Sequence, residues 1–233
     1  MTRDEYINNL FKIYDLVSVL SDKNECRVLR LRNKKLCRDI VIRSYPETIA
    51  VYDSLAEIKC ANIPMVFDCI ALDDGQIVLE EYIDGITVSQ FMEAEKYHYK
   101  DAKIVLKGVC NALSTLHSLN FVHRDVKPEN VIIDSLNNVY LIDFNVSRKV
   151  TNASRDTVVM GTVGYASPEQ LGISQSDART DIYAAGVLLN VMLTGKHPSE
   201  TLASGKAGKI VRKCTAVNPS DRYQTAKRLF DAL

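Results

Sequence analysis

The sequence predicts an α+β fold in which a small sheet-rich part precedes a larger helical part. Before residue 84, short runs of alternating apolar and polar residues are separated by turn-forming residues, which is typical of antiparallel strands. After that position apolar residues recur with a helical period, and residues 181–193 are apolar almost all round, as in a buried helix. We therefore expect an N-lobe at 1–83 and a C-lobe at 84–233, together forming one two-lobed domain.

The N-lobe is expected to be a mostly antiparallel sheet with one helix. Its strands are expected at 14–20, 26–31, 39–43, 65–72 and 76–82. The Asp-Asp-Gly sequence at 73–75 predicts a tight turn between the last two. Ser44 and Glu47 have the spacing of a capping box, which predicts a helix from there to about residue 59.

The C-lobe is expected to be mainly helical. A helix at 101–119 would bury one face, made by Ile104, Val105, Val109, Leu113 and Leu116. Short strands are expected at 131–133 and 139–142, and a last helix at 222–233.

The composition excludes several classes of protein. The 233 residues are 46% hydrophobic, and 29 Lys+Arg balance 29 Asp+Glu, so neither nucleic acid nor a membrane is expected as a partner of this segment. The longest apolar run, 183–193, is too short to span a bilayer. The six cysteines lack C-x-x-C spacing, which argues against zinc and disulfides and favours a reducing cytoplasm. The acidic and amide residues of the first turns are not expected of a signal peptide.

A polar cluster at 121–130, with the sequence FVHRDVKPEN, lies between apolar flanks and reads as a loop held between buried elements. Its polar residues include His123, Arg124, Asp125, Lys127 and Asn130, and Asp143 follows a predicted strand further on, in LIDFN. Asp125 and Asn130 could separately do no more than cap a turn. All of these residues at these spacings argue against turn capping as the whole explanation.

These motifs resemble the catalytic loop and metal-binding segment of the eukaryotic-like (Hanks-type) protein kinases, in their bacterial serine/threonine branch. A lysine at the position of Lys127 resembles serine/threonine kinases more than tyrosine kinases. The resemblance implies that Asp125 accepts or orients the proton of a substrate hydroxyl as the catalytic base. It implies that Lys127 neutralises charge on the transferred phosphate, and that Asn130 and Asp143 bind Mg²⁺. It also implies ATP as phosphoryl donor and a protein serine or threonine as acceptor.

The resemblance continues at 161–169, GTVGYASPE, which looks like the end of an activation segment. It implies a hydrogen bond from Thr162 near Asp125 and Lys127, and a buried pair between Glu169 and Arg222. Asp181 would accept backbone hydrogen bonds from the catalytic loop, or cap its own helix.

Two further expectations concern packing and regulation. His123 and Phe144 would pack the loop against the helical core. Candidates for phosphorylation in the polar segment are Thr151, Ser154 and Thr157, with Arg124 as a partner for an added phosphate.

The sequence departs from the family pattern, mostly in the first lobe and at Asn145 in the second. The place of the glycine-rich loop, 20–28, contains no glycine, so backbone amides cannot approach phosphates as closely. Arg43 stands where the phosphate-binding lysine belongs, and Val51 replaces that lysine's usual glutamate partner. Asn145 replaces the glycine of D-F-G. Glu80 falls at the gatekeeper position, and we hypothesise that it pairs with Arg43.

The resemblance also implies a set of nucleotide-binding residues, namely Val28, Val41, Arg43, Glu80, Glu81, Ile83 and Ile132. Between residues 195 and 214 there is room for only a short segment, so the substrate-docking part of the C-lobe is expected to be trimmed.

Two functions follow from this pattern. The first is a serine/threonine protein kinase, because the residues expected to handle the hydroxyl and the metal are all present. The alternative is a pseudokinase that acts as an interaction or nucleotide-sensing module, because the phosphate-gripping residues of the first lobe have changed.

Overall fold

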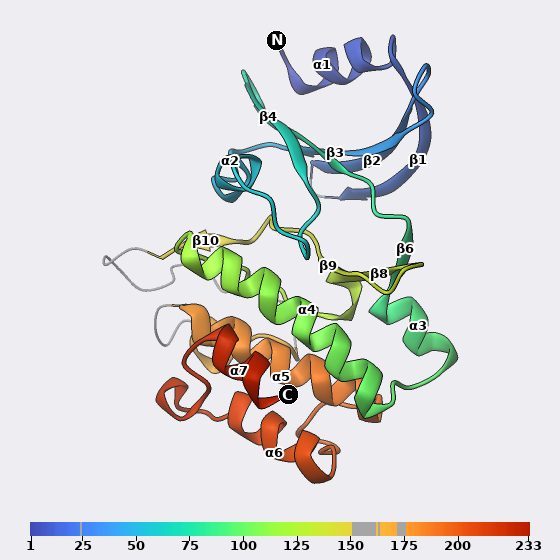
Figure 1. Cartoon of the computed structure of the whole chain (residues 1–233). Helices are drawn as coiled ribbons and strands as arrows, with labels where there is room; N and C mark the ends of the chain where they lie inside the picture. The colour runs from blue at the N-terminus through green and yellow to red at the C-terminus, as the bar shows by residue number, and fades with distance from the viewer. Residues whose placement is uncertain (24, 151–161, 163, 172–175) are drawn as a thin grey trace. The chain divides into compact units, whose positions relative to one another are not determined.

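The computed structural model describes residues 1–233 except 24, 151–161, 163 and 172–175. The chain divides into two compact units, Met1–Cys60 with Pro64–Ile83 and Ala61–Ile63 with Asp84–Leu233. The first is built mainly from antiparallel strands and the second mainly from helices, which confirms the α+β fold class (Figure 1).

The first unit is built around an antiparallel sheet with strand order β1-β2-β3-β5-β4. Its strands are β1 (Tyr14–Lys23), β2 (Cys26–Asn33), β3 (Asp39–Tyr45), β4 (Val66–Leu72) and β5 (Gly75–Glu81), which confirms the predicted strands. One face forms a core with Leu31, Ile42 and Ile77, onto which helix α1 (Arg3–Leu10) packs Ile7. The sequence before residue 14 mixes helical and strand signals, so it does not predict α1.

The predicted capping box at Ser44 and Glu47 is wrong. Ser44 lies within β3, where it is opposite Ile77 of β5, and it is buried in the sheet. The helix α2 (Val51–Ala56) starts later, after Ala50, with no side-chain cap. The strand continues through Ser44 because its backbone groups pair with β5, and the ladder bonds outcompete a local cap.

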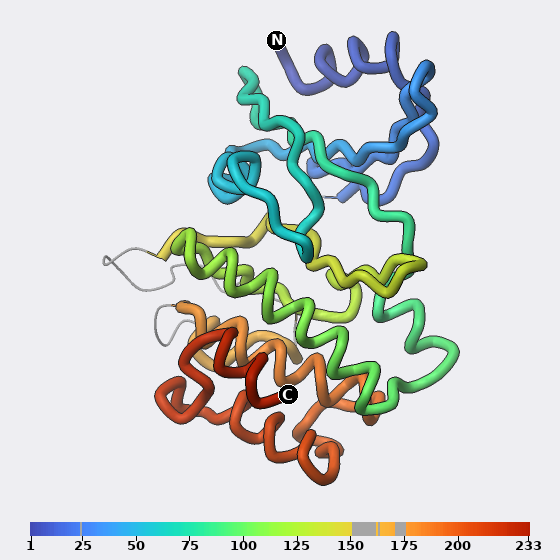
Figure 2. Tube along the Cα trace, in the orientation of Figure 1, coloured from blue at the N-terminus to red at the C-terminus, as the bar shows by residue number. Residues whose placement is uncertain are grey.

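The second unit is a helical layer with short strands at one side (Figure 2). Its helices are α3 (Val88–Ala94), α4 (Tyr99–Ser118), α5 (Ala178–Thr194), α6 (Gly205–Cys214) and α7 (Ala226–Ala232). Its strands are β6 (Gly85–Thr87), β7 (Phe121–Val122), β8 (Val131–Asp134), β9 (Val139–Leu141) and β10 (Arg148–Lys149), arranged as β6-β8-β9 and β10-β7. Helix α5 packs against α4, α6 and α7, and most of its residues are buried.

The helices at 101–119 and 181–193 are confirmed, with two corrections of detail. Ile104 is 50% exposed rather than part of the core, because it lies on a face of α4 that other elements leave open. The last helix begins only at Ala226, after the Thr225 cap, because the side chain of Arg222 is drawn inward to Glu169. None of the helices in the described part of the chain is long and apolar enough to cross a membrane.

Candidate active site

The expected catalytic loop starts at β7, whose Val122 lies opposite Arg148 of β10, and α5 holds its backbone. The Asp181 carboxylate, fully buried in α5, accepts the backbone N–H of His123 (2.9 Å) and that of Arg124 (2.8 Å). These two bonds fix Arg124 at φ +70°, a conformation that non-glycine residues adopt only when their surroundings demand it. The expected loop-holding role of Asp181 is confirmed, whereas the cap of α5 is Asp177.

His123 packs the loop onto the segment that carries Asp143. Its ring lies edge-on to Phe144 at 5.2 Å between centroids, and both side chains are buried, as expected. The Asp125 N–H points at Nδ1, and Nε2 lies 3.2 Å from the Ile142 carbonyl, so the hydrogen bonds place the proton on Nε2. Burial lowers the pKa of His123 despite the nearby carboxylates, so the ring is neutral at pH 7 and acts as a spacer.

Asp125 is the centre of a cluster of polar side chains. One oxygen accepts the Thr162 hydroxyl at 2.7 Å, and the other lies 2.7 Å from the Lys127 ammonium and 2.9 Å from the Asn130 amide nitrogen. Lys127 also donates to Thr162 at 2.8 Å, which confirms the expected placement of Thr162. Burial raises the pKa of Asp125, but hydrogen bonds from Lys127 and Thr162 outweigh it and hold the pKa below 3.8. The carboxylate is therefore charged and already accepts one aliphatic hydroxyl.

The two residues expected to bind Mg²⁺ are joined through the backbone. The Asn130 amide nitrogen donates to Asp125, which leaves its Oδ1 as the atom available for a cation. The Ile142 N–H donates to the Asn130 carbonyl at 2.9 Å and so brings the residue before Asp143 beside Asn130. An amide oxygen and a carboxylate are hard donors that suit Mg²⁺, which completes its shell with phosphates and water. In the described ranges no group of three His, Cys, Asp or Glu side chains could hold a metal by itself.

In the first unit, the hypothesised pair between Arg43 and Glu80 is confirmed. The Nε atom of Arg43 lies 2.7 Å from Oε1 of Glu80, and the two residues are only 6% and 2% exposed. The register places Val28 opposite Arg43 and Val41 opposite Glu80, so these four side chains share the sheet face opposite the α1 core.

The remaining residues expected to bind nucleotide are divided between the units. Glu81 ends β5, and its carboxylate accepts the Met65 N–H at 3.2 Å, while Ile83 is buried at the end of the first unit. Ile132 lies in β8 of the second unit and is half-buried.

The place of the glycine-rich loop lies where β1 ends and β2 begins. Lys23 and Cys26 face each other across the β1–β2 ladder, and Glu25 has φ +63°. The carbonyl of Glu25 accepts a hydrogen bond from Arg3 of α1 at 3.0 Å. Nothing in the sequence suggests this tie, because Arg3 is distant in the chain and belongs to a helix that the pattern does not predict.

The described end of the expected activation segment is anchored to the helices of the second unit. Arg222 binds Glu169 with two hydrogen bonds of 2.6 and 2.9 Å, both side chains being buried, which confirms the predicted pair. Burial raises the pKa of Glu169, but Arg222 outweighs it and lowers the pKa. Gln170, which the sequence does not single out, donates to the Arg124 carbonyl at 3.0 Å and ties this segment to the catalytic loop. The candidate phosphorylation residues Thr151, Ser154 and Thr157 lie outside the described residues.

A carboxylate that accepts a hydroxyl beside a lysine, next to an amide and a carboxylate suited to Mg²⁺, is the arrangement of a phosphoryl-transfer domain. Residues 33–228 match the model of the protein kinase domain, and the chain belongs to the protein kinase family.

The chain is similar to several curated bacterial proteins. It is 29% identical over 212 residues to serine/threonine-protein kinase PrkC of Bacillus subtilis, which covers 77% of this chain and 33% of that protein. It is 30% identical over 229 residues to serine/threonine-protein kinase PknB of Mycobacterium tuberculosis, covering 85% and 34%. For serine/threonine-protein kinase D of Synechocystis the values are 28% over 225 residues, covering 86% and 44%. The chain thus spans from about a third to under half the length of these relatives.

Proposed function

We propose that the chain is a serine/threonine protein kinase that transfers the γ-phosphoryl group of ATP to a protein hydroxyl. The observation that carries the proposal is the triangle of Asp125, Lys127 and Thr162, in which a charged carboxylate and an ammonium converge on a threonine hydroxyl. A substrate hydroxyl at Asp125 would give up its proton there as its oxygen bonds to the γ-phosphorus and ADP leaves. Because its pKa is low, Asp125 serves more to orient the hydroxyl than to remove its proton early.

Asn130 and Asp143 would hold Mg²⁺, which neutralises phosphate charge when it is bound. Lys127 places an ammonium beside the Asp125 carboxylate, which receives the substrate hydroxyl. This ammonium would stabilise the negative charge that builds up on the transferred phosphoryl group. The names of PrkC and PknB as serine/threonine kinases support the acceptor class. Since the cytoplasm supplies both ATP and Mg²⁺, we place the reaction there.

The test is transfer of labelled phosphate from ATP to an acceptor protein in the presence of Mg²⁺. Asp125→Asn keeps the size of the side chain but removes its charge, and is expected to lower the rate by roughly 10²–10⁴-fold. Chelation of Mg²⁺ with EDTA is expected to abolish transfer. Asp221→Asn, at an exposed aspartate outside the cluster, is the matched control and should retain the native rate. Equal rates for the native chain and Asp125→Asn would contradict the proposal.

Two observations favour a second candidate, a nucleotide-sensing or interaction module without transfer activity. The β1–β2 connection has no glycine, and Glu80 binds the arginine that replaces the phosphate-binding lysine. If this candidate is right, the native chain transfers no phosphate while Mg²⁺-ATP or a protein partner still raises its Tm.

A further inference from the structure

The connection from β1 to β2 lacks the residue type that its backbone requires. Residues 20–28 contain no glycine, yet Glu25 has φ +63°. A non-glycine residue is strained in this left-handed region, and it stays there only when neighbouring groups hold it. Strand β1 gives limited support, because it lies at the edge of the sheet and pairs with β2 alone. The connection therefore needs a tie from another element.

Arg3, the first residue of α1, supplies such a tie. Its Nη1 donates to the Glu25 carbonyl at 3.0 Å and to the Ser44 hydroxyl at 3.3 Å. Its Nε lies 3.4 Å from the carboxylate of Asp74, between β4 and β5, and the Arg3 side chain is only 15% exposed. One planar guanidinium thus joins the start of β2 to β3 and to the β4–β5 turn.

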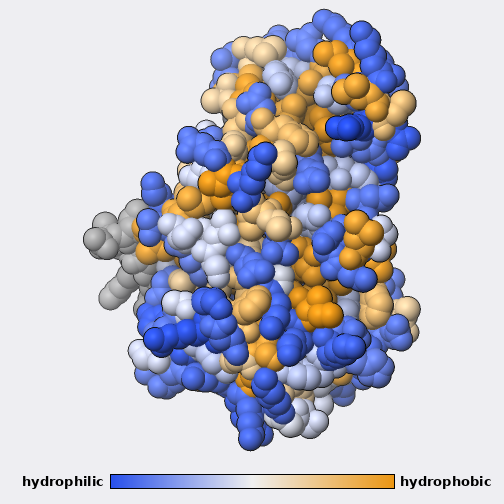
Figure 3. All heavy atoms as spheres, viewed as in Figure 1, coloured by the Kyte–Doolittle hydropathy of each residue, from blue (hydrophilic) through white to orange (hydrophobic). Residues whose placement is uncertain are grey.

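The backbone of Arg3 is fixed as well. Its N–H donates to the Asp74 carboxylate at 2.7 Å, and Thr2 and Glu5 form a capping box around it. One turn later Ile7 is buried in the core of the sheet. Figure 3 shows mainly hydrophilic side chains along the top of the first unit, where α1 lies, so the helix packs through its inner side. A side chain held at both ends loses little further freedom when it holds another group.

The next residue of α1 adds a second tie on the other side of Cys26. The carboxylate of Asp4 forms an ion pair with Arg27 of β2. This pair is more exposed than the contacts of Arg3, so it contributes little stability by itself. It nevertheless means that Glu25 and Arg27, which flank Cys26, are both bound to the first turn of α1.

The contact with Ser44 lies directly behind the altered phosphate-binding position. Successive side chains of a strand point to opposite faces, so Ser44 lies on the α1 side of β3 while Arg43 lies on the other side with Glu80. Arg3 therefore supports both the β1–β2 connection and the strand that presents Arg43. These are the two parts of the first unit that the family resemblance places at the phosphates of ATP.

We infer that Arg3 is a positioning residue for the nucleotide, because it holds the β1–β2 connection and β3 in the geometry that accepts the phosphates of ATP. The inference rests on the proposed kinase function for the identity of the ligand. A glycine-rich loop can adjust its backbone around phosphates after they bind. A connection without glycine has fewer conformations to choose from, so its affinity depends on being held in the right one beforehand.

The test is the binding of the fluorescent nucleotide mant-ATP with Mg²⁺ to the full chain. Arg3→Met keeps the aliphatic stem and removes every side-chain donor, and is expected to raise the Kd roughly fivefold. The KM for ATP should rise by the same factor, while kcat and the KM for the acceptor protein stay near their native values. Arg3→Lys retains the charge and should recover part of the affinity. Asp74→Asn weakens one support of Arg3 and should raise the Kd about twofold.

The thiol of Cys26 gives a second measurement that does not involve the nucleotide. Cys26 is half-buried and follows Glu25, whereas Cys37 of the same unit is exposed. In Arg3→Met, alkylation of Cys26 by N-ethylmaleimide, followed by peptide mapping, is expected to be several-fold faster than in the native chain. Alkylation of Cys37 should not change. An increase confined to Cys26 places the effect at the β1–β2 connection rather than in the stability of the whole unit.

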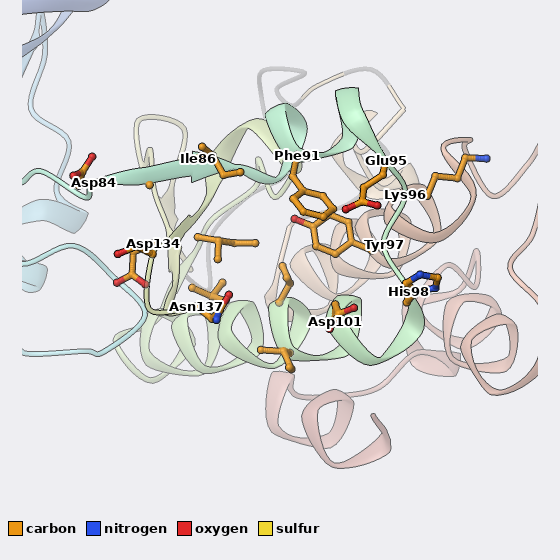
Figure 4. Close-up of a pocket in the computed structure, with 16 residues that line it drawn as sticks. Asp84, Ile86, Phe91, Glu95, Lys96, Tyr97, His98, Asp101, Asp134 and Asn137 are labelled. Carbon is orange, nitrogen blue, oxygen red and sulfur yellow. The ribbon is translucent and has the colours of Figure 1, made fainter.

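Two control variants remove a cation elsewhere. Arg38→Met changes an exposed arginine of the first unit. Lys96→Met changes a lysine of the second unit whose ammonium points away from the neighbouring cavity (Figure 4). Both are expected to bind mant-ATP and to react at Cys26 like the native chain.

The inference is overturned by a native Kd for mant-ATP in Arg3→Met, by unchanged alkylation of Cys26, or by an equal loss of affinity in Arg38→Met. It is also overturned if the native chain binds no Mg²⁺-ATP. Should Arg3→Met not fold, Arg3→Lys and Asp74→Asn test the same contacts. Weaker binding in Arg3→Met, together with no transfer by the native chain, would overturn the proposed kinase activity alone. Transfer with an unchanged KM for ATP in Arg3→Met would overturn the positioning role alone.

Discussion

The pair of Arg43 and Glu80 places two opposite charges on one face of the β-sheet of the first unit. Both groups are desolvated, so each depends on the other, and removal of one partner from such a pair costs on the order of 3–5 kcal/mol. The Nε–H of Arg43, at the side of its planar guanidinium group, donates to the Glu80 carboxylate. A lysine has its only donor at the end of the side chain, so it cannot reproduce this geometry. Arg43 therefore serves as the ion-pair partner of Glu80, and it is not merely a poorer substitute for the family's lysine.

Arg43→Lys is accordingly expected to lower activity, although it restores the residue typical of the family. The free energy of unfolding should also fall by about 1–3 kcal/mol, because the buried carboxylate loses part of its hydrogen bonding. Urea unfolding and the rate of phosphate transfer measure the two effects. Arg38→Lys, at an exposed arginine, is the control and should change stability by less than about 0.5 kcal/mol. Higher activity in Arg43→Lys would show that the pair is not needed.

Helix α5 organises the second unit because its buried polar residues contact both the catalytic loop and the described end of the expected activation segment. Asp181 holds the backbone of the catalytic loop, and Thr180 donates to Glu169 at 3.0 Å, the same carboxylate that Arg222 binds. The position of the catalytic loop thus depends on one helix, and the geometry of Asp125 should be sensitive to changes in it.

Asp181→Asn is expected to reduce kcat more than it changes KM. The amide nitrogen would face an N–H of the loop in place of an oxygen, leaving a buried donor unsatisfied at a cost of about 1–3 kcal/mol. Arg124 could then leave its positive φ, and Asp125 would move with it. Asp177→Asn is the matched control on the same helix, since asparagine caps helices as well as aspartate does. Similar loss of kcat in both variants would mean that the helix as a whole, not the loop contact, matters.

At the level of elements, the sequence predicts helices and strands that have a periodic apolar pattern. It does not predict features that depend on contacts with residues far away in the chain. The strands of the first unit follow from alternation, and α5 follows from its apolar composition. The capping box at Ser44 fails because a local pattern cannot show that the backbone there pairs with β5. Ile104 fits the helical period of α4 yet remains exposed, because burial depends on what covers the face.

The site shows the same division. The Asp125 cluster is contained in short motifs with fixed spacing, so its members can be named from the sequence. Gln170 and Arg3 act through long-range hydrogen bonds, among them bonds to backbone carbonyls, and any chain contains many similar side chains. Glu80 is an intermediate case, since a charged residue at an expected apolar position is itself a signal.

At the scale of the whole molecule, most departures from the family pattern fall in the first unit and the intact motifs fall in the second, where Asn145 is an exception. The first unit contains most of the changed residues, including Arg43, Glu80 and the glycine-free β1–β2 connection, while the second contains the complete Asp125 cluster. Each unit has its own buried core, so changes in one need not disturb the packing of the other.

The stability of the molecule is expected to fall on acidification in two stages. Burial holds the pKa of His123 below 6.5. Below that pH, His123 binds a proton in the unfolded chain but stays neutral in the native state, so the free energy of unfolding falls. Asp125 and Glu169 have pKa values lowered by their partners, against the effect of burial, so a second loss follows below about pH 4.5. Each group contributes at most about 1.4 kcal/mol per pH unit to the free energy of unfolding.

Urea unfolding from pH 8 to pH 4 should therefore show the first decline in the free energy of unfolding near pH 6.5. His123→Gln should remove this first decline. His98→Gln, at an exposed histidine, is the control and should keep it. A free energy of unfolding that is constant between pH 7 and pH 5 would mean that His123 is protonated in the native state or that its burial is relieved there.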